Sequence, residues 1–283
     1  MTDLDWNGCL NTRDLGGFPT RHGGVTRGGT VIRTDSLDKL DSVGLTALTG
    51  VGAGLVLDLR SDWEMKQPHP LDGVAAYRRI PWIDPVREKD RVPADEPLLA
   101  DIYRGSLDRN QGQIGQALRT LAEAPQGQPV VVHCKSGKDR TGLLVALLLD
   151  LVGVPREEIA TDYAISEQRL GVLARIAALP VDERAAALVL SRTLPETILD
   201  SLEYVDTQYG GVRAYLTQCG LTPLELHRLA TRLVESPIEA VVPGLSATFS
   251  ESAPSASSTS SRRATRSPAT SRTRRSTYSP WNA

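Results

Sequence analysis

The sequence has little that would support a disulfide framework, a cysteine zinc site or a membrane anchor. Its 283 residues include three cysteines, Cys9, Cys134 and Cys219, and no CxxC pair. So sparse and odd a number argues against structural disulfides and thiolate-bound zinc. The longest apolar run, 143–154, is interrupted by Asp150 and is too short to span a bilayer. The acidic, polar N-terminus does not read as a secretory signal. We therefore expect a soluble, cytoplasmic protein, with export by a route without a signal left open.

A strong excess of one charge is also missing. The formal net charge of −2 gives no reason to expect a nucleic-acid partner. The average hides a basic end, because residues 236–283 carry six arginines and two glutamates, a balance of +4 that leaves −6 for residues 1–235. Residues 246–280 are mostly Ser, Thr, Ala, Arg and Pro and cannot form a core. We predict a folded domain over 1–235 and a disordered, solvated tail over 236–283, with binding to anionic surfaces as the less favoured role of the tail.

The folded part begins with strand and helix patterns in alternation and ends in helical patterns alone. Short apolar or alternating runs predict strands over 25–33 (an edge strand or hairpin), 55–59, 77–80 and 130–132. Helical spacing is found over 42–48, 111–122, 143–151 and 157–234. This order favours an α/β domain with a C-terminal helical elaboration.

One loop carries the candidate chemistry, the stretch HCKSGKDRTG over 133–142, between an apolar strand and an apolar helix. At the start of a helix several backbone N–H groups lack an acceptor and point toward any anion in the loop. Successive N–H groups around one point form a nest for an anion. Cys134 follows the strand directly, and a thiolate is stabilised there and made nucleophilic. The stretch therefore predicts an anion-binding loop with a thiol nucleophile.

Further side chains of the loop suit the handling of a phosphate. Arg140 can grip two phosphate oxygens with its planar guanidinium and stabilise their charge during transfer. Thr141 can donate its hydroxyl to the sulfur when the sulfur becomes the leaving group. Glycines at 137 and 142 let the backbone turn closely around a ligand. The remaining predicted phosphate contacts are Lys135, Ser136, Gly137 and Lys138.

These residues resemble the signature of the protein-tyrosine phosphatases, in which His-Cys is followed after five residues by Arg and Ser or Thr. Three further motifs, at 11–17, 58–61 and 209–216, resemble the bacterial family typified by the mycobacterial protein tyrosine phosphatase B. The resemblance covers 7–235. It implies the cysteine-phosphatase fold, with a central, mostly parallel sheet flanked by helices. It also implies action on phosphotyrosine, and in some members on phosphoserine, phosphothreonine or phosphoinositides. Thr12 replaces the aromatic residue usual in the first motif, which is expected to alter local packing.

Transfer of a phosphoryl group needs a proton donor for the leaving oxygen. By the resemblance, that donor is Asp139, next to the signature arginine. Asp84, in a proline-rich loop, and Asp58, at a strand end, are rivals for this role. We favour instead a role in a turn for Asp84 and a role in an ion pair for Asp58. Arg60 is expected either to form an ion pair or to bind substrate together with Asp58.

Other family features carry weaker expectations. Arg13 and Asp14 are expected to tie the N-terminal segment to the site. Trp63 and Glu64 are expected to be structural. Some members place a helical lid over the site, and whether residues 171–197 do so here stays open.

We interpret the chain as a bacterial protein-tyrosine phosphatase that works through a phosphocysteine. Dual specificity, for phosphoserine and phosphothreonine as well as phosphotyrosine, is left open. It needs no metal or organic cofactor, because the loop and Arg140 supply the positive charge. The partners expected are a phosphotyrosine protein or a phosphoinositide. A phosphoinositide phosphatase is the first alternative, because Lys135 and Lys138 occupy lysine positions found in lipid phosphatases. A phosphoprotein-binding module without turnover ranks next. A thiol redox enzyme ranks last, since no resolving cysteine is adjacent.

Overall fold

The central feature of the fold is a twisted sheet in which one strand leads directly into the signature loop, residues 133–142. The computed structural model describes residues 2–65, 69–71, 73–74 and 76–234. Within them one six-stranded sheet has the order β1-β2-β3-β6-β4-β5. Strands β3, β6, β4 and β5 are parallel, and β1 and β2 add an antiparallel edge. The strand bounds are β1 Thr2–Asp3, β2 Arg13–Asp14, β3 Val31–Thr34, β4 Leu55–Asp58, β5 Tyr77–Arg79 and β6 Val130–His133.

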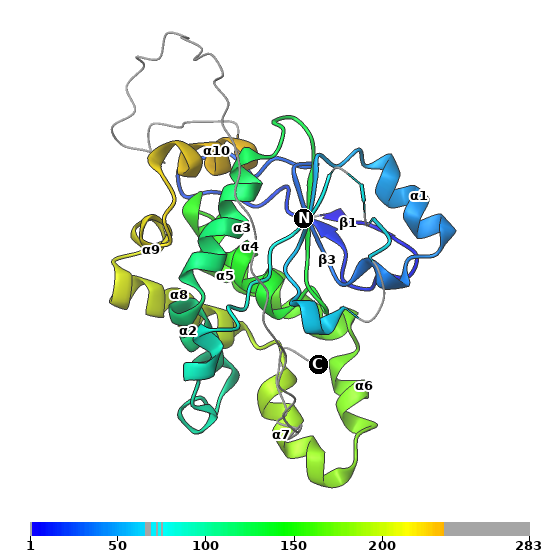
Figure 1. The fold of residues 1–283 in the computed structure, drawn as a ribbon, viewed down its shortest axis with the longest axis vertical. Helices are drawn as coiled ribbons and strands as arrows, with labels where there is room; N and C mark the ends of the chain where they lie inside the picture. Colours follow the sequence, from blue (N-terminus) through cyan, green and yellow to red (C-terminus); the bar gives the residue numbers. More distant parts are fainter. Residues whose placement is uncertain (1, 66–68, 72, 75, 235–283) are drawn as a thin grey trace, which may run out of the picture.

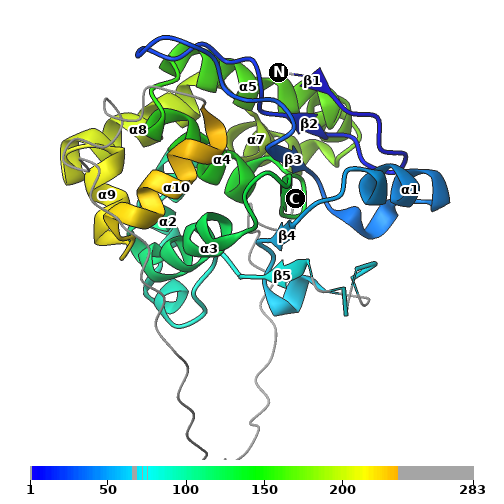
Figure 2. The same ribbon diagram turned by 90° about the horizontal axis from the view of Figure 1, so that it is seen from above.

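Helices cover the two faces of the sheet unequally. The short helix α1 (Ser42–Gly50) lies on one face, and Figure 2 shows it across the sheet from α3 and α4. Most of the core lies on the other face, where α4 is buried along nearly its whole length. A helix apolar on every side has to be surrounded by other elements. The helices of this larger layer are α2 (Leu99–Arg109), α3 (Gln111–Glu123), α4 (Asp139–Leu151), α5 (Arg156–Arg169), α8 (Pro195–Tyr209), α9 (Val212–Gln218) and α10 (Pro223–Leu233).

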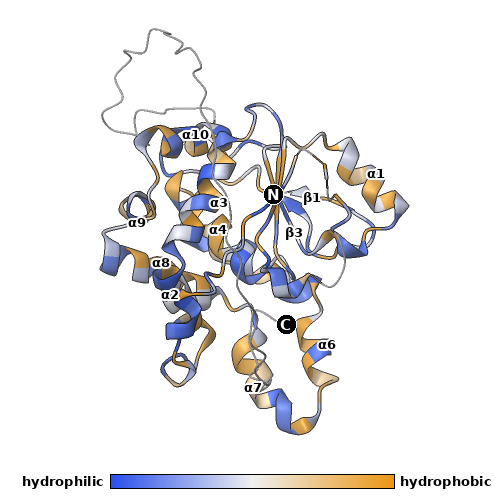
Figure 3. Ribbon diagram, in the orientation of Figure 1, coloured by the Kyte–Doolittle hydropathy of each residue, from blue (hydrophilic) through white to orange (hydrophobic). Residues whose placement is uncertain are grey.

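Two further helices form a projecting hairpin. Helices α6 (Val172–Ala177) and α7 (Val181–Ser191) extend away from the body of the molecule at the bottom of Figure 1. Both are largely hydrophobic in Figure 3. They share a small apolar cluster of their own with Leu170 and Leu179. The hairpin is therefore held together mainly by its own contacts.

The structure confirms the predicted α/β class and most predicted elements. The prediction of an edge strand or hairpin over 25–33 is wrong, because β3 lies inside the sheet and pairs in parallel with β6. The first family motif contains the two-residue strand β2, where only a turn was expected. Helix α4 begins at Asp139, four residues before the predicted start. Those four residues belong to the signature loop, whose polar sequence hid the start of the helix.

In the part of the chain that the structure describes, no helix combines the length and apolarity needed to cross a membrane. The predicted basic tail over 236–283 lies outside the described residues.

Candidate active site

Strand β6 delivers Cys134 to the turn that leads into α4. The cysteine is 1% exposed and packs in the main core. Because α4 starts at Asp139, residues 134–139 form the loop in front of its N-terminus. The first N–H groups of a helix lack intrahelical acceptors and carry partial positive charge. The predicted context of strand, tight loop and helix is therefore the one observed.

Three successive carbonyls of this loop are bound from outside it. The Lys135 carbonyl accepts from the Ser36 N–H at 2.9 Å. The Ser136 carbonyl accepts from Asn11 Nδ2 at 3.0 Å. The Gly137 carbonyl accepts from Arg33 Nη2 at 2.6 Å and from Asn11 Nδ2 at 3.1 Å. In an extended peptide unit the N–H points opposite to the carbonyl, so carbonyls held from outside favour the arrangement that an anion nest requires.

Gly137 is required by the close approach of the loop to β3. Its φ is +61°, in the left-handed region that side chains disfavour. A Cβ at this position would lie 2.3 Å from the Thr34 carbonyl oxygen. The glycine therefore serves the close approach of the loop to β3, and the predicted role in turning around a ligand stays a prediction.

A buried ion-pair network around Asp162 holds the residues that bind the loop carbonyls. Arg13 Nε contacts Asp162 Oδ1 at 2.7 Å, and Arg33 pairs with Asp162 Oδ2. Burial would raise the pKa of Asp162, but Arg33 and Arg13 lower it. Arg13 also donates to Asn11 Oδ1 at 2.6 Å, which orients the Asn11 amide toward the loop. The N-terminal motif is thus tied to the site through Arg13, whereas Asp14 accepts from the N–H groups of Gly16 and Gly29 and fixes a turn.

Arg140 is held in place by Glu64, from the turn after β4. The guanidinium nitrogens lie 2.5 and 2.7 Å from the two carboxylate oxygens. Both side chains are almost fully buried, at 2% and 4% exposure. Burial would lower the pKa of Arg140, but Glu64 and Cys134 raise it, so the charge persists. The sequence predicted a structural role for Glu64, and only the fold shows that its partner is Arg140.

The two neighbours of Arg140 in the sequence are also buried. Asp139 is 5% exposed and accepts a hydrogen bond from Tyr103 at 2.6 Å. Thr141 is fully buried, and its hydroxyl has no hydrogen-bond partner among the described residues. A buried hydroxyl with an unused donor suits the predicted contact with the sulfur of Cys134.

Lys138 faces the hairpin of α6 and α7. Its Nζ donates to the Ser191 carbonyl at 2.7 Å and lies 3.2 Å from Asp139 Oδ1. In the structure the side chain of Lys138 thus links the loop to α7, and its contact with phosphate stays a prediction. Lys135, in contrast, is exposed.

The hairpin of α6 and α7 shares a cavity with the signature loop. The cavity has a volume of about 810 Å³ and reaches Ser136 and Lys138 of the loop. Its other walls are mostly apolar and come from Leu170, Val172, Ile176, Ala178, Leu179, Ala186 and Ala187. The hairpin is thus next to the signature loop, and a lid made of residues 171–197 stays a prediction.

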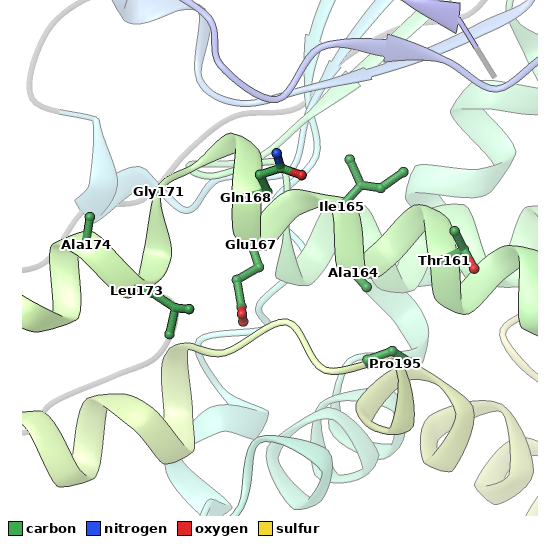
Figure 4. A pocket seen from close by; sticks show the side chains of 9 residues that line it. All are labelled: Thr161, Ala164, Ile165, Glu167, Gln168, Gly171, Leu173, Ala174 and Pro195. Carbon is green, nitrogen blue, oxygen red and sulfur yellow. The ribbon is translucent and has the colours of Figure 1, made fainter.

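A second pocket, of about 540 Å³, lies between α5, α6 and the start of α8 (Figure 4). It contains no residue of the signature loop. Figure 4 shows Glu167 reaching toward the segment between α7 and α8, where it accepts from Arg192 Nε at 2.7 Å and Thr193 N at 2.9 Å. These bonds fix the end of α7 to α5.

For Asp58 and Arg60 the structure shows the ion pair that the sequence offered as one of two roles. Both residues are buried, and Arg60 Nη2 lies 2.9 Å from Asp58 Oδ2. Arg60 also binds Asp38, and Asp58 also accepts from the Tyr77 hydroxyl at 3.0 Å. His133 and Arg60 lower the pKa of Asp58 against the effect of burial. The pair is a structural ion pair in which the donors and acceptors are already used.

Asp84, the other rival for the acid, forms a turn. Its Oδ1 accepts from the N–H groups of Val86 and Arg87, at 2.8 and 3.2 Å. A carboxylate used in this way stabilises the loop backbone. Of the three aspartates considered as the acid, only Asp139 lies in the signature loop.

One buried group of side chains has metal-binding residue types: Asp58, His69 and His133. The hydrogen bond of His69 does not suit a metal ligand. His69 Nδ1 accepts from the Leu71 N–H at 3.1 Å, so in the neutral ring Nε2 carries the proton and has no lone pair for a cation. A metal-bound histidine normally donates through its second nitrogen instead. Burial and His133 lower the pKa of His69 to about 4, which keeps this ring neutral.

Residues 4–235 match the family model described as "Tyrosine phosphatase family". The chain is 32% identical over 223 residues to a "Tyrosine-protein phosphatase" of Nostoc commune, covering 71% of this chain and 73% of the relative. It is 27% identical over 270 residues to the "Triple specificity protein phosphatase PtpB" of Mycobacterium tuberculosis, covering 78% of this chain and 95% of the relative.

Proposed function

The chain belongs to the tyrosine phosphatase family and is a protein-tyrosine phosphatase, and we propose that it works in two steps through a phosphocysteine on Cys134. The observation that carries this proposal is the outward anchoring of three loop carbonyls by Ser36, Asn11 and Arg33. It leaves the loop N–H groups as a preformed cradle for a phosphate in front of the thiol.

In the first step, the Cys134 thiolate attacks phosphorus. A P–S bond forms while the bond between phosphorus and the ester oxygen breaks. Asp139 gives its proton to the departing oxygen. Arg140, held by Glu64, binds two of the oxygens that gain charge during transfer.

In the second step, water attacks the phosphocysteine. Asp139, now ionised, accepts the proton from the water as the new P–O bond forms. The P–S bond breaks, and the electron pair returns to sulfur. The unpartnered hydroxyl of Thr141 donates to the sulfur and stabilises it as the leaving group.

The substrates extend in this proposal beyond phosphotyrosine to phosphoserine and phosphothreonine, because one relative carries the name of a triple-specificity phosphatase. A phosphoinositide is the second candidate substrate, supported by the exposed Lys135 at the mouth of the loop. Lys138 is engaged by Ser191, so it reaches a headgroup only after α7 has moved. A thiol nucleophile requires a reducing compartment, so we also propose the cytoplasm as its location.

The test compares phosphate release from matched phosphotyrosine, phosphoserine, phosphothreonine and phosphoinositide substrates. The wild type and Cys134→Ser are measured side by side, in the presence of a chelator. Cys219→Ser is the control, because Cys219 lies between α9 and α10, outside the signature loop. We expect release by the wild type and the control and none by Cys134→Ser. A phosphoryl adduct on the peptide that carries Cys134, after acid quenching, identifies the intermediate.

Other outcomes would change the proposal. No release from any substrate, with vanadate still bound, would favour the binding module without turnover. Release by Cys134→Ser equal to the wild type would contradict the cysteine mechanism. Release from phosphoinositides alone would move the assignment to a lipid phosphatase.

A further inference from the structure

We propose that Tyr103 and Tyr163 are positioning residues for the acid of the reaction, a relay of two buried hydroxyls that aims the carboxyl group of Asp139 at the leaving oxygen. The inference rests on the proposed role of Asp139 and extends it to two residues outside the signature loop. The two tyrosines come from α2 and α5, about 30 residues before and 20 residues after the loop.

The relay is defined by two short contacts. The Tyr103 hydroxyl donates to Asp139 Oδ1 at 2.6 Å, and the hydroxyls of Tyr103 and Tyr163 lie 2.8 Å apart. Tyr103 is 0% exposed and Tyr163 is 1% exposed. The two rings meet edge to face, with centroids 6.2 Å apart. Both phenols are therefore locked by packing as well as by hydrogen bonds.

The direction of the hydrogen bonds follows from the chemistry of the groups. Burial and the charge of Asp139 raise the pKa of both phenols well above the usual value, so both stay protonated. An ionised carboxylate can only accept, so Tyr103 donates to Asp139. Tyr103 then has only its lone pairs left, so Tyr163 donates to Tyr103. The relay delivers one fixed donor to one carboxylate oxygen.

That oxygen is also the one nearest Lys138. Lys138 Nζ lies 3.2 Å from Oδ1, the same atom that Tyr103 binds. Tyr103 and Lys138 both hold Oδ1, so Oδ2 is the oxygen assigned in this proposal to exchange a proton with substrate and water. The ionisable groups that act on the acid and the relay are Tyr103 from α2, Tyr163 and Glu167 from α5, Lys138 from the loop, Arg140 from α4 and Arg33 from β3.

The fold makes room for the relay at one glycine. A Cβ on Gly142 would lie 3.0 Å from Tyr163 Cδ2 and 3.2 Å from Cε2. Any larger residue would push the Tyr163 ring away from α4 and open the gap between the hydroxyls. The last glycine of the signature stretch thus serves the approach of α5 to the loop.

A positioned acid matters most when the leaving oxygen is a poor leaving group. General acid assistance contributes about 100-fold or more where the leaving oxygen needs its proton, and little where the anion is already stable. The hydroxyl of Tyr103 also stabilises the ionised carboxylate, the form that accepts a proton from water in the second step. Loss of the relay is therefore expected to change the leaving-group dependence of the reaction.

The test uses Tyr103→Phe and a series of substituted phenyl phosphates. We expect kcat/KM, which reports the step in which the leaving oxygen departs, to fall about 10-fold with phenyl phosphate and less than about 2-fold with p-nitrophenyl phosphate. The matched control is Tyr215→Phe, which removes another buried hydroxyl bound to α2, at the Leu107 carbonyl at 2.8 Å, away from Asp139.

A double-variant cycle separates positioning from packing. In the Asp139→Asn background, Tyr103→Phe is expected to have no further effect on kcat/KM. An equal loss in that background, or equal effects of Tyr103→Phe and Tyr215→Phe, would overturn the inference.

If Tyr103→Phe does not fold, as judged by thermal melting and vanadate binding, Tyr163→Phe tests the same relay. It is expected to show the same pattern with a smaller fold-change. An inactive wild type would instead contradict the proposed function.

Discussion

Glu64 and Arg140 form a paired, nearly solvent-free contact between the turn after β4 and the first turn of α4. Their side chains meet through two hydrogen bonds of 2.5 and 2.7 Å. A guanidinium bound in this way cannot rotate, so its remaining face is fixed relative to Cys134. Because the side chain is already ordered, binding of phosphate does not cost the conformational entropy that a mobile arginine would lose.

Glu64→Gln is expected to lower kcat/KM for p-nitrophenyl phosphate by about 10-fold to 100-fold. The variant keeps the shape of the side chain but leaves a buried arginine without its counter-charge. Unfolding in urea should show a loss of about 3 kcal/mol or more for the same reason. Asp62→Asn, on the same turn, is the control, because the Asp62 side chain is 82% exposed and pairs only at the surface. Unchanged kinetics in Glu64→Gln would contradict this role.

Asn11→Ala is expected to weaken binding of inorganic phosphate or vanadate by about 10-fold. Its amide holds the carbonyls of Ser136 and Gly137, and without it two buried acceptors lose a partner. Calorimetric titration with vanadate measures the change. Asn7→Ala is the control, since the exposed Asn7 bonds only to Asp41. Equal affinities for the two variants would show that the loop keeps its shape without Asn11.

The three thiols are expected to differ in their reaction with iodoacetate. Burial raises the pKa of Cys9 to about 11 and that of Cys219 to about 12, so both are thiols at pH 8. Cys134 lies in the anion cradle and should be alkylated first, with protection by phosphate. Peptide mapping after short exposure at pH 8 identifies the modified residue. Rapid labelling of Cys9 or Cys219 under these conditions would contradict the prediction.

The stability of the fold is expected to fall between pH 7 and pH 5 because of His69. Burial lowers its pKa from 6.5 to about 4, so the folded protein keeps the ring neutral while the unfolded chain binds a proton. This contribution is present above pH 6.5 and is lost as pH falls toward 4, by about 2 kcal/mol between pH 7 and pH 5. Urea titrations at both pH values measure it. His69→Asn should reduce the pH dependence by about this amount, and an unchanged dependence would contradict the assignment.

Local patterns were enough to predict the centre of the site. The run 130–132, the loop that follows and the apolar helix after it are contiguous in the sequence, so their residue types alone predict a strand, an anion nest and a helix. The spacing of Cys134 and Arg140 carries the chemistry for the same reason. The strand β3 was misplaced because its parallel partner β6 lies about 100 residues away, and no local signal reports such a pairing.

The sequence by itself determined the class of the fold, the signature loop and the family, because each depends on residues that are neighbours along the chain. The tertiary structure decided which distant side chains serve that loop. Glu64, Asn11 and Arg33 reach it from other strands and turns, Tyr103 and Tyr163 from other helices, and Lys138 turns toward α7. A buried charge or carbonyl needs a partner, but its position in the sequence does not say which one, since only the packing of the sheet and helices brings the two together.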